Sequence, residues 1–122
     1  MADILNVGFD SALLTTRRVM LERAGHRVAL AHDFRQAVAA CERKSFNIVI
    51  LGNSLLANEK LRVADIVRRH CDGVRLLELH NGAKPDLPDA DAHLQALQAR
   101  PEEFLQAVDS LLKQPNRRAA KE

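Results

Sequence analysis

Apolar residues have two different spacings along this chain, one typical of strands and the other typical of helices. Short runs rich in Val, Ile and Leu are separated by longer stretches with apolar residues at i, i+3, i+4 and i+7. The runs predict buried strands and the stretches between them predict amphipathic helices. The predicted strands are Ile4–Val7, Arg27–Ala31, Phe46–Leu51, Val74–Leu79 and Ala92–Leu97.

Capping residues mark where the first two helices begin and end. Asp10 or Ser11 is expected to cap the first helix, and Gly25 stands where a left-handed C-terminal stop belongs. Asp33 is expected to cap the second helix. Its apolar positions have helical spacing and are Phe34, Ala37, Val38 and Cys41.

Two further helices complete the pattern. The third is predicted from about Asn58 to His70, and the final helix begins near Pro101, a residue that suits a first helical turn. The predicted inward side of the third helix carries Leu61, Ala64, Val67 and Cys71. The predicted buried stripe of the final helix is Phe104, Leu105, Val108, Leu111 and Leu112.

Alternating strands and helices predict a parallel sheet, because parallel strands need long, right-handed crossovers. Five strands favour a flavodoxin-like, doubly wound α/β domain over residues 1–114. The segment "HNGAKPDLPDAD", residues 80–91, contains a glycine and two prolines. We therefore expect a loop there in place of a fourth helix. Residues 115–122, "PNRRAAKE", predict a basic flexible tail.

Composition narrows the function classes. The net charge is only +2 and the chain has four Phe but no Tyr or Trp, which argues against a nucleic-acid partner. No apolar run is long enough to predict a membrane span, and the N-terminus lacks the pattern of a signal peptide, so a cytoplasmic protein is expected. The two cysteines, Cys41 and Cys71, fall at apolar helix positions and are expected to pack as small hydrophobes.

The order and spacing of these elements resemble the receiver domain of response regulators in bacterial two-component signalling. The opening "ILNVGFDSALLTTRRVMLERAGHRVALA" is similar to the family's first strand, helix and second strand, and "RPEEFLQAVDSLLK" is similar to its closing helix. The resemblance covers about residues 3–113. It implies a phosphorelay module whose chemistry uses an acceptor aspartate, an acidic pair for Mg²⁺, a Ser or Thr and a Lys.

At the positions that the resemblance assigns to those side chains, this sequence has other residues. The acceptor position falls on Gly52, the acidic pair on Gly8 and Phe9, the hydroxyl on or next to His80, and the lysine on about Leu97. We therefore expect no catalytic residue, no metal ligand and no cofactor. The module is interpreted as a degenerate receiver, a pseudo-receiver without enzyme activity.

Polar residues near these positions keep other hypotheses open. Asp10, Asn53, Ser54 and His80 are candidate ligand or anion contacts, although capping, turn formation and a structural histidine are the alternatives. The leading hypothesis is a phosphorylation-independent module that binds a protein partner in signalling, and a homodimer is a further pairing that the resemblance allows. One alternative is a small-molecule or anion sensor that binds at the strand ends. A second alternative is a receiver phosphorylated on an unconventional residue such as Asp10 or Ser54.

Overall fold

The computed structural model describes residues 2–114, which form a five-stranded sheet in the order β2-β1-β3-β4-β5 with every neighbouring pair parallel. This is the doubly wound sheet that the alternating pattern predicts. The chain moves outward from β1 to β2 and then crosses back to β3, so the direction of winding reverses between the two central strands. The strands are β1 (Asp3–Val7), β2 (Arg27–Ala31), β3 (Ile48–Leu51), β4 (Arg75–His80) and β5 (Ala92–Gln95).

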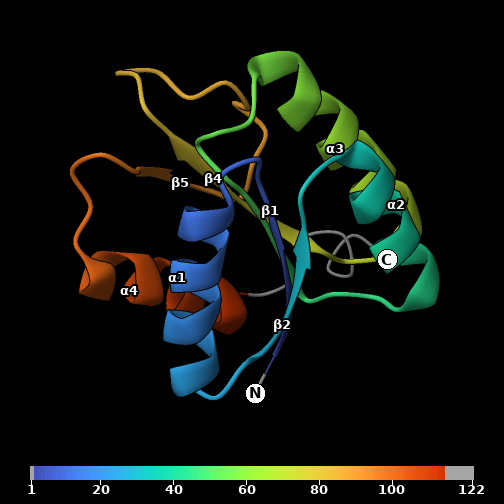
Figure 1. Cartoon of the computed structure of the whole chain (residues 1–122), viewed down its shortest axis with the longest axis horizontal. Coiled ribbons are helices and arrows are strands. Elements are labelled where there is room, and N and C mark those ends of the chain that lie inside the picture. Colours follow the sequence, from blue (N-terminus) through green and yellow to red (C-terminus); the bar gives the residue numbers. More distant parts are fainter. Residues whose placement is uncertain (1, 115–122) are drawn as a thin grey trace.

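Helices cover both faces of the sheet (Figure 1). On one face lie α1 and α4, and on the other lie α2 and α3. Residues 81–91 between β4 and β5 contain no helix, as the glycine and prolines in that segment predict. The helices are α1 (Ser11–Arg23), α2 (Phe34–Arg43), α3 (Ala57–His70) and α4 (Pro101–Lys113).

The predicted caps are present. Asp10 Oδ1 accepts hydrogen bonds from the amides of Ala12 and Leu13 at 3.0 and 3.1 Å, and Asp33 Oδ1 accepts one from the Gln36 amide at 2.8 Å. These contacts satisfy amides that the first turns of α1 and α2 leave without helical partners. Gly25 has a φ of +96°, the left-handed conformation that its position after α1 predicts.

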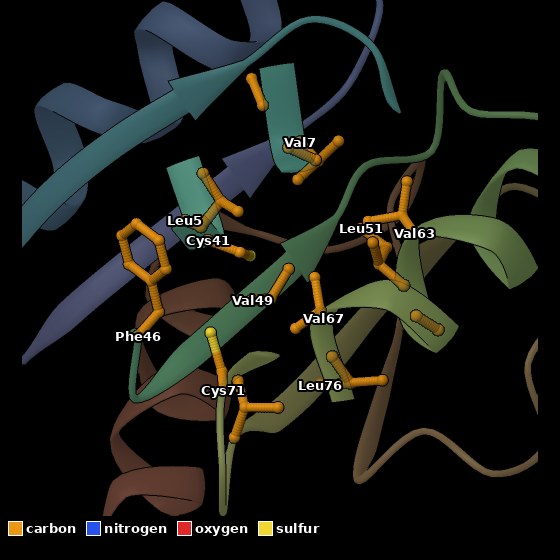
Figure 2. Packing of buried hydrophobic residues seen from close by; sticks show 14 of the residues in the cluster. Leu5, Val7, Cys41, Phe46, Val49, Leu51, Val63, Val67, Cys71 and Leu76 are labelled. Carbon is orange, nitrogen blue, oxygen red and sulfur yellow. The ribbon is translucent and has the colours of Figure 1, made fainter. Parts of the chain in front are cut away.

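Two apolar layers form the core, one on each face of the sheet. Successive strand residues point to opposite faces, so Leu5, Val49 and Leu76 pack toward α2 and α3 (Figure 2). Ile4 and Ile50 pack instead toward α1 and α4. The buried members of the α4 stripe are Phe104, Val108 and Leu111, while Leu105 and Leu112 are only half-buried.

Both cysteines lie in the layer between the sheet and α2–α3, as their apolar positions predict (Figure 2). Burial, together with the neighbouring Cys71 thiol, raises the pKa of the Cys41 thiol to about 12. A buried thiol held in its neutral form is a packing group and a poor nucleophile.

Some predicted boundaries and faces are wrong. β5 ends at Gln95 instead of Leu97, because the Ala99 amide donates to the Gln95 carbonyl at 3.1 Å and turns the chain. Leu61, predicted on the inward side of α3, is exposed, and Lys60 is buried in its place. No helix within residues 2–114 is long and apolar enough to cross a bilayer. The predicted tail, residues 115–122, lies outside the described part of the chain.

Candidate functional site: the carboxyl edge of the sheet

The carboxyl ends of β1, β3 and β4 bring Gly8, Gly52 and His80 to one edge of the sheet. Gly8 and Gly52 directly follow the two central strands, and His80 is the last residue of β4. In doubly wound sheets ligands bind in the crevice outside these strand ends, where the winding reverses. Gly8, Gly52 and His80 therefore lie on neighbouring strands, and Leu97 lies farther along the same edge, in the turn after β5.

Gly52 lies where no side chain fits without movement of the sheet. Its amide donates to the Val7 carbonyl at 2.8 Å, and a Cβ placed on Gly52 would lie only 2.8 Å from the same oxygen. Carbon and oxygen that are not bonded do not approach so closely. An aspartate at position 52 would require β1 and β3 to move apart.

The loop after β1 is held by Ser54. The Ser54 hydroxyl oxygen accepts hydrogen bonds from the amides of Phe9 at 2.8 Å and Asp10 at 3.2 Å. A Cβ on Gly8 would lie 3.1 Å from that hydroxyl oxygen, so the small residue allows the loop after β3 to approach. Ser54 therefore fastens the two loops together, and the Asp10 carboxylate is engaged in capping α1.

Arg17 is a functional candidate that the sequence analysis missed. It lies in α1, and its Nη2 donates to Asn53 Oδ1 at 2.8 Å. Its Nη1 would lie 3.6 Å from a Cβ on Gly52, so the guanidinium occupies the space beside the acceptor position. Burial lowers the pKa of Arg17, and the charge of the nearby Asp10 acts in the opposite direction.

The network continues from Asn53 across the edge of the sheet. Asn53 Nδ2 donates to Asn81 Oδ1 at 2.9 Å, and Asn81 Nδ2 donates to the Asn53 carbonyl at 3.2 Å. Gln95 Nε2 then donates to the Asn81 carbonyl at 3.0 Å. Amide side chains thus connect the ends of β3, β4 and β5, and Arg17 joins α1 to the same network.

His80 and Leu97 occupy very different surroundings. His80 is buried, and its Nδ1 is 2.8 Å from the Gly82 carbonyl oxygen, which matches the structural histidine that the sequence allows. Leu97 lies in the turn after β5 with 72% of its surface exposed. Neither residue supplies the hydroxyl or the ammonium group of a receiver pocket.

A second charged cluster lies beneath the loop of residues 81–91. Lys60 is 1% exposed and Glu78 is fully buried, and Lys60 Nζ lies 2.9 Å from Glu78 Oε2. Lys60 Nζ also donates to the Leu79 carbonyl at 3.0 Å and to Asp86 Oδ2 at 2.9 Å. The Glu78 carboxylate also accepts hydrogen bonds from the amides of Asp86 at 2.8 Å and Leu87 at 3.0 Å, and His93 Nε2 lies 3.7 Å from its Oε1.

Glu78 therefore fixes the loop by its backbone amides, and Lys60 supplies the counter-charge. A buried carboxylate needs such a partner because its desolvation is costly. The cluster holds in place the segment that replaces the fourth helix. It is a structural centre with every charge engaged.

The residues at the carboxyl edge do not fit Mg²⁺. That ion prefers several oxygen ligands, whereas Gly8, Phe9 and Gly52 offer no side-chain oxygen and Asp10 caps a helix. Within residues 2–114 no group of three or more His, Cys, Asp or Glu side chains could hold a metal ion. The Arg17 guanidinium beside Gly52 adds a positive charge that would repel a cation. The edge thus carries polar side chains and the positive charge of Arg17.

The sheet order, the parallel pairing and the two pairs of covering helices give this chain the fold of CheY-like response-regulator receiver domains. The chemotaxis protein CheY4 of Vibrio cholerae superposes with a TM-score of 0.80 at 21% identity, over 91% of this chain and 98% of CheY4. A CheY-like receiver domain protein from Methanospirillum hungatei has a TM-score of 0.79 at 22% identity, over 92% of this chain and 94% of that protein.

Two proteins of Pseudomonas aeruginosa add a link to sensor kinases. The receiver domain of sensor histidine kinase PA1611, which holds a magnesium ion in its active-site cleft, has a TM-score of 0.77 at 19% identity, covering 93% of this chain and 98% of that domain. In sequence, 55 residues are 38% identical to sensor histidine kinase AruS, a match over 45% of this chain and 6% of AruS. No protein-family model matches the sequence.

Proposed function

We propose that this protein is a degenerate receiver that binds a protein partner in bacterial two-component signalling without being phosphorylated. The observation that carries this proposal is Gly52, which has no carboxylate and stands against the Val7 carbonyl and the Arg17 guanidinium. The nucleophile, the metal ligands and the readout residues of a receiver are absent together. No enzyme activity is proposed, and a cytoplasmic location follows from the proposed pathway.

Exposed apolar side chains at the carboxyl edge support a docking role. Phe9 follows β1 and is 45% exposed, Leu56 precedes α3 and is 65% exposed, and Leu97 follows β5 and is 72% exposed. We call these three residues the edge triad. Large apolar side chains on loops beside a rigid sheet are typical of surfaces that bind protein partners. Arg17 and the asparagines fix the loops without help from a phosphoryl group.

Phosphorylation on an unconventional residue has less support. The Ser54 hydroxyl accepts two amide hydrogen bonds, and the Asp10 carboxylate accepts two more. A phosphoryl group on either oxygen would break contacts that hold the loop after β1 and the start of α1. Asn53 and Ser54 are likewise engaged with other residues of the chain, so they are poorly placed to bind an anion.

The first test is the intact mass of the protein after incubation with acetyl phosphate and Mg²⁺. We expect an unchanged mass, while Vibrio cholerae CheY4, treated in parallel as a control, tests the reagent. A new phosphoryl mass on this protein would overturn the proposal.

The second test compares partner capture by variants of the edge triad. Phe9→Ser and Leu56→Ser should lose a partner that the unaltered protein enriches from cells of its host, because each removes an exposed apolar contact. Leu61→Ser is the matched control, since Leu61 is exposed on α3 outside the triad. Equal capture by all three variants would show that the carboxyl edge is not the docking surface. Acetyl phosphate should leave the captured amount unchanged.

A further inference from the structure

A cleft lies between α1 and the start of α4, on the face of the sheet opposite α2 and α3. Leu13 and Met20 line it from α1, and Leu79 and Leu94 line it from the adjacent strands β4 and β5. Its volume is about 130 Å³. An apolar cavity of about 150 Å³ holds one benzene molecule, so the space suits a single six-membered ring.

Small residues keep the opposite wall of the cleft open. The turn from β5 to α4 contributes Ala96 and Ala99, and Phe104 of α4 lies deeper. Longer side chains at the two alanines would fill the space that separates this turn from α1. The cleft therefore exists because small residues occupy the turn that follows β5.

Two arginines and Thr16 are the polar residues that line the mainly apolar cleft. Arg17 belongs to α1, and Arg100 precedes the first turn of α4. Arg100 Nε is 3.2 Å from Glu103 Oε1, so part of its charge is already balanced. Within residues 2–114 Arg17 has no carboxylate within 4 Å, and Asn53 is its one hydrogen-bond acceptor.

A partly buried guanidinium without a carboxylate in contact is only partly compensated, because Asp10 acts on Arg17 only as a nearby charge. Burial removes water from Arg17, as the lowered pKa of this group reflects, and Asn53 replaces only one of the five hydrogen bonds that its N–H groups offer. A planar carboxylate would accept two of the remaining N–H groups in the forked geometry that arginine favours. Arg17 is thus complementary to an anion.

We propose that the cleft between α1 and α4 binds a small aromatic monocarboxylate, with the ring between Leu79 and Ala99 and the carboxylate on Arg17. The ring would be removed from water by apolar side chains, and the carboxylate would balance the part of the Arg17 charge that Asp10 leaves uncompensated. This proposal does not rest on the docking function. Binding would nevertheless reach the carboxyl edge, because Arg17 is also hydrogen-bonded to Asn53.

Benzoate is the probe, and two analogues separate its two recognition elements. Benzamide keeps the ring and the shape but has no charge, and acetate keeps the charge but has no ring. We expect benzoate to bind in a saturable way with a dissociation constant on the order of 1 mM or below, as expected for a ligand of this size. In NMR titrations at constant ionic strength, the backbone amide resonances of α1 and of residues 96–100 should shift as benzoate is added.

Three variants locate the site on the protein. Arg17→Gln should weaken benzoate binding roughly 10- to 100-fold, the factor that a charge-assisted hydrogen bond contributes. Ala99→Leu should abolish binding by filling the cleft while all charges remain. Ala12→Leu adds the same bulk on the exposed side of α1 and should bind benzoate like the unaltered protein.

The outcomes divide clearly. The site would be supported if benzoate binds saturably, if this binding is lost in Ala99→Leu and kept in Ala12→Leu, and if benzamide binds at least about tenfold more weakly than benzoate. Equal affinity for benzamide would overturn the anion requirement, and unchanged binding to Ala99→Leu would overturn the location. An absence of saturable shifts up to roughly 20 mM benzoate would overturn the proposal as a whole.

Discussion

Replacing Lys60 by methionine removes one buried charge and leaves its partner in place. Methionine has nearly the length of the lysine stem, so the packing against α3 and β4 is preserved. The variant loses the Nζ contacts to Glu78 Oε2 at 2.9 Å, the Leu79 carbonyl at 3.0 Å and Asp86 Oδ2 at 2.9 Å. Glu78 then keeps two backbone amides and the His93 ring 3.7 Å away, but it loses the ammonium group that balances its charge.

The magnitude follows from the burial of these groups. Breaking one side of a buried ion pair costs about 3–5 kcal/mol, because the remaining charge stays out of water. Glu78 is fully buried and meets that condition, whereas Asp86 is 39% exposed and can turn to solvent. The total free energy of unfolding of such a domain is about 5–15 kcal/mol, so the loss is a large fraction of it.

Urea denaturation at 25 °C measures this loss. With an m-value of about 1.5 kcal/mol/M, the midpoint should fall by roughly 2–3 M at unchanged slope. The matched control is Lys44→Met, which removes an exposed pair with Asp3 and should cost about 1 kcal/mol or less. A loss below about 1 kcal/mol for Lys60→Met, with the slope unchanged, would refute the argument that Glu78 depends on Lys60.

A double-mutant cycle separates the charge pair from packing. Glu78→Gln alone leaves the Lys60 ammonium buried, and it cannot accept both loop amides. The double variant Lys60→Met and Glu78→Gln has no buried charge left unpaired. Its loss of stability should be smaller than the sum of the two single losses by about 1–3 kcal/mol. Simple additivity would show that the two side chains act independently.

Three further predictions test other parts of the structure. Gly52→Asp should lower the melting temperature, because its Cβ meets the Val7 carbonyl oxygen at 2.8 Å. The variant should also gain no phosphoryl mass with acetyl phosphate and Mg²⁺, so a variant that is phosphorylated and as stable as the original would contradict this prediction. Cys41, whose pKa burial raises to about 12, should react with iodoacetamide at pH 8 only after urea unfolds the chain, and rapid alkylation of the native protein would disprove its burial. Burial lowers the pKa of His26 more than the charge of Asp109 raises it. The unfolded chain therefore binds the proton more readily, and the free energy of unfolding should fall as the pH drops below about 6.5. His26→Gln should flatten that part of the pH profile, and an unchanged profile would exclude His26 as the cause.

Most of the fold could be predicted from the sequence because strand and helix periods are clear along residues 2–114. The five strands and the four helices are confirmed, and so is the loop predicted at residues 80–91, except that β4 continues to His80. The errors lie at element ends and on one helix face. β5 stops two residues early because side-chain and backbone contacts of Gln95 close a turn, which no apolar pattern records.

Lys60 shows why the inward face of α3 was misjudged. The buried residues Lys60, Val63, Ala64 and Val67 have the i, i+3, i+4, i+7 spacing of an inward stripe. Lysine is rarely buried, so a pattern of apolar residues favours Leu61 over Lys60 as the inward residue. The compensating Glu78 stands 18 residues away, and only the packing of α3 on β4 brings the two together.

The candidate site was predicted in its positions but not in its contacts. The convergence of Gly8, Gly52 and His80 follows from parallel topology, and all three lie at the carboxyl ends of neighbouring strands. Arg17 was missed although it interrupts an inward row at Leu14 and Leu21, spaced i, i+3 and i+7. A charged residue in such a row is a signal that could have been used. The steric reason for Gly52 needs the distance between two strands and cannot be obtained from sequence.

The close approach of β1 and β3 at Gly52 has an evolutionary consequence. Glycine and aspartate have neighbouring codons, so mutation can readily supply an aspartate at this position. That mutant, however, would have a strained sheet with Arg17 beside the new carboxylate, and positions 8 and 9 would still lack the acidic pair. Each single step toward a receiver pocket with an acceptor aspartate would be harmful or neutral on its own. The lineage of this protein is therefore expected to keep the glycine and to change at its binding surfaces.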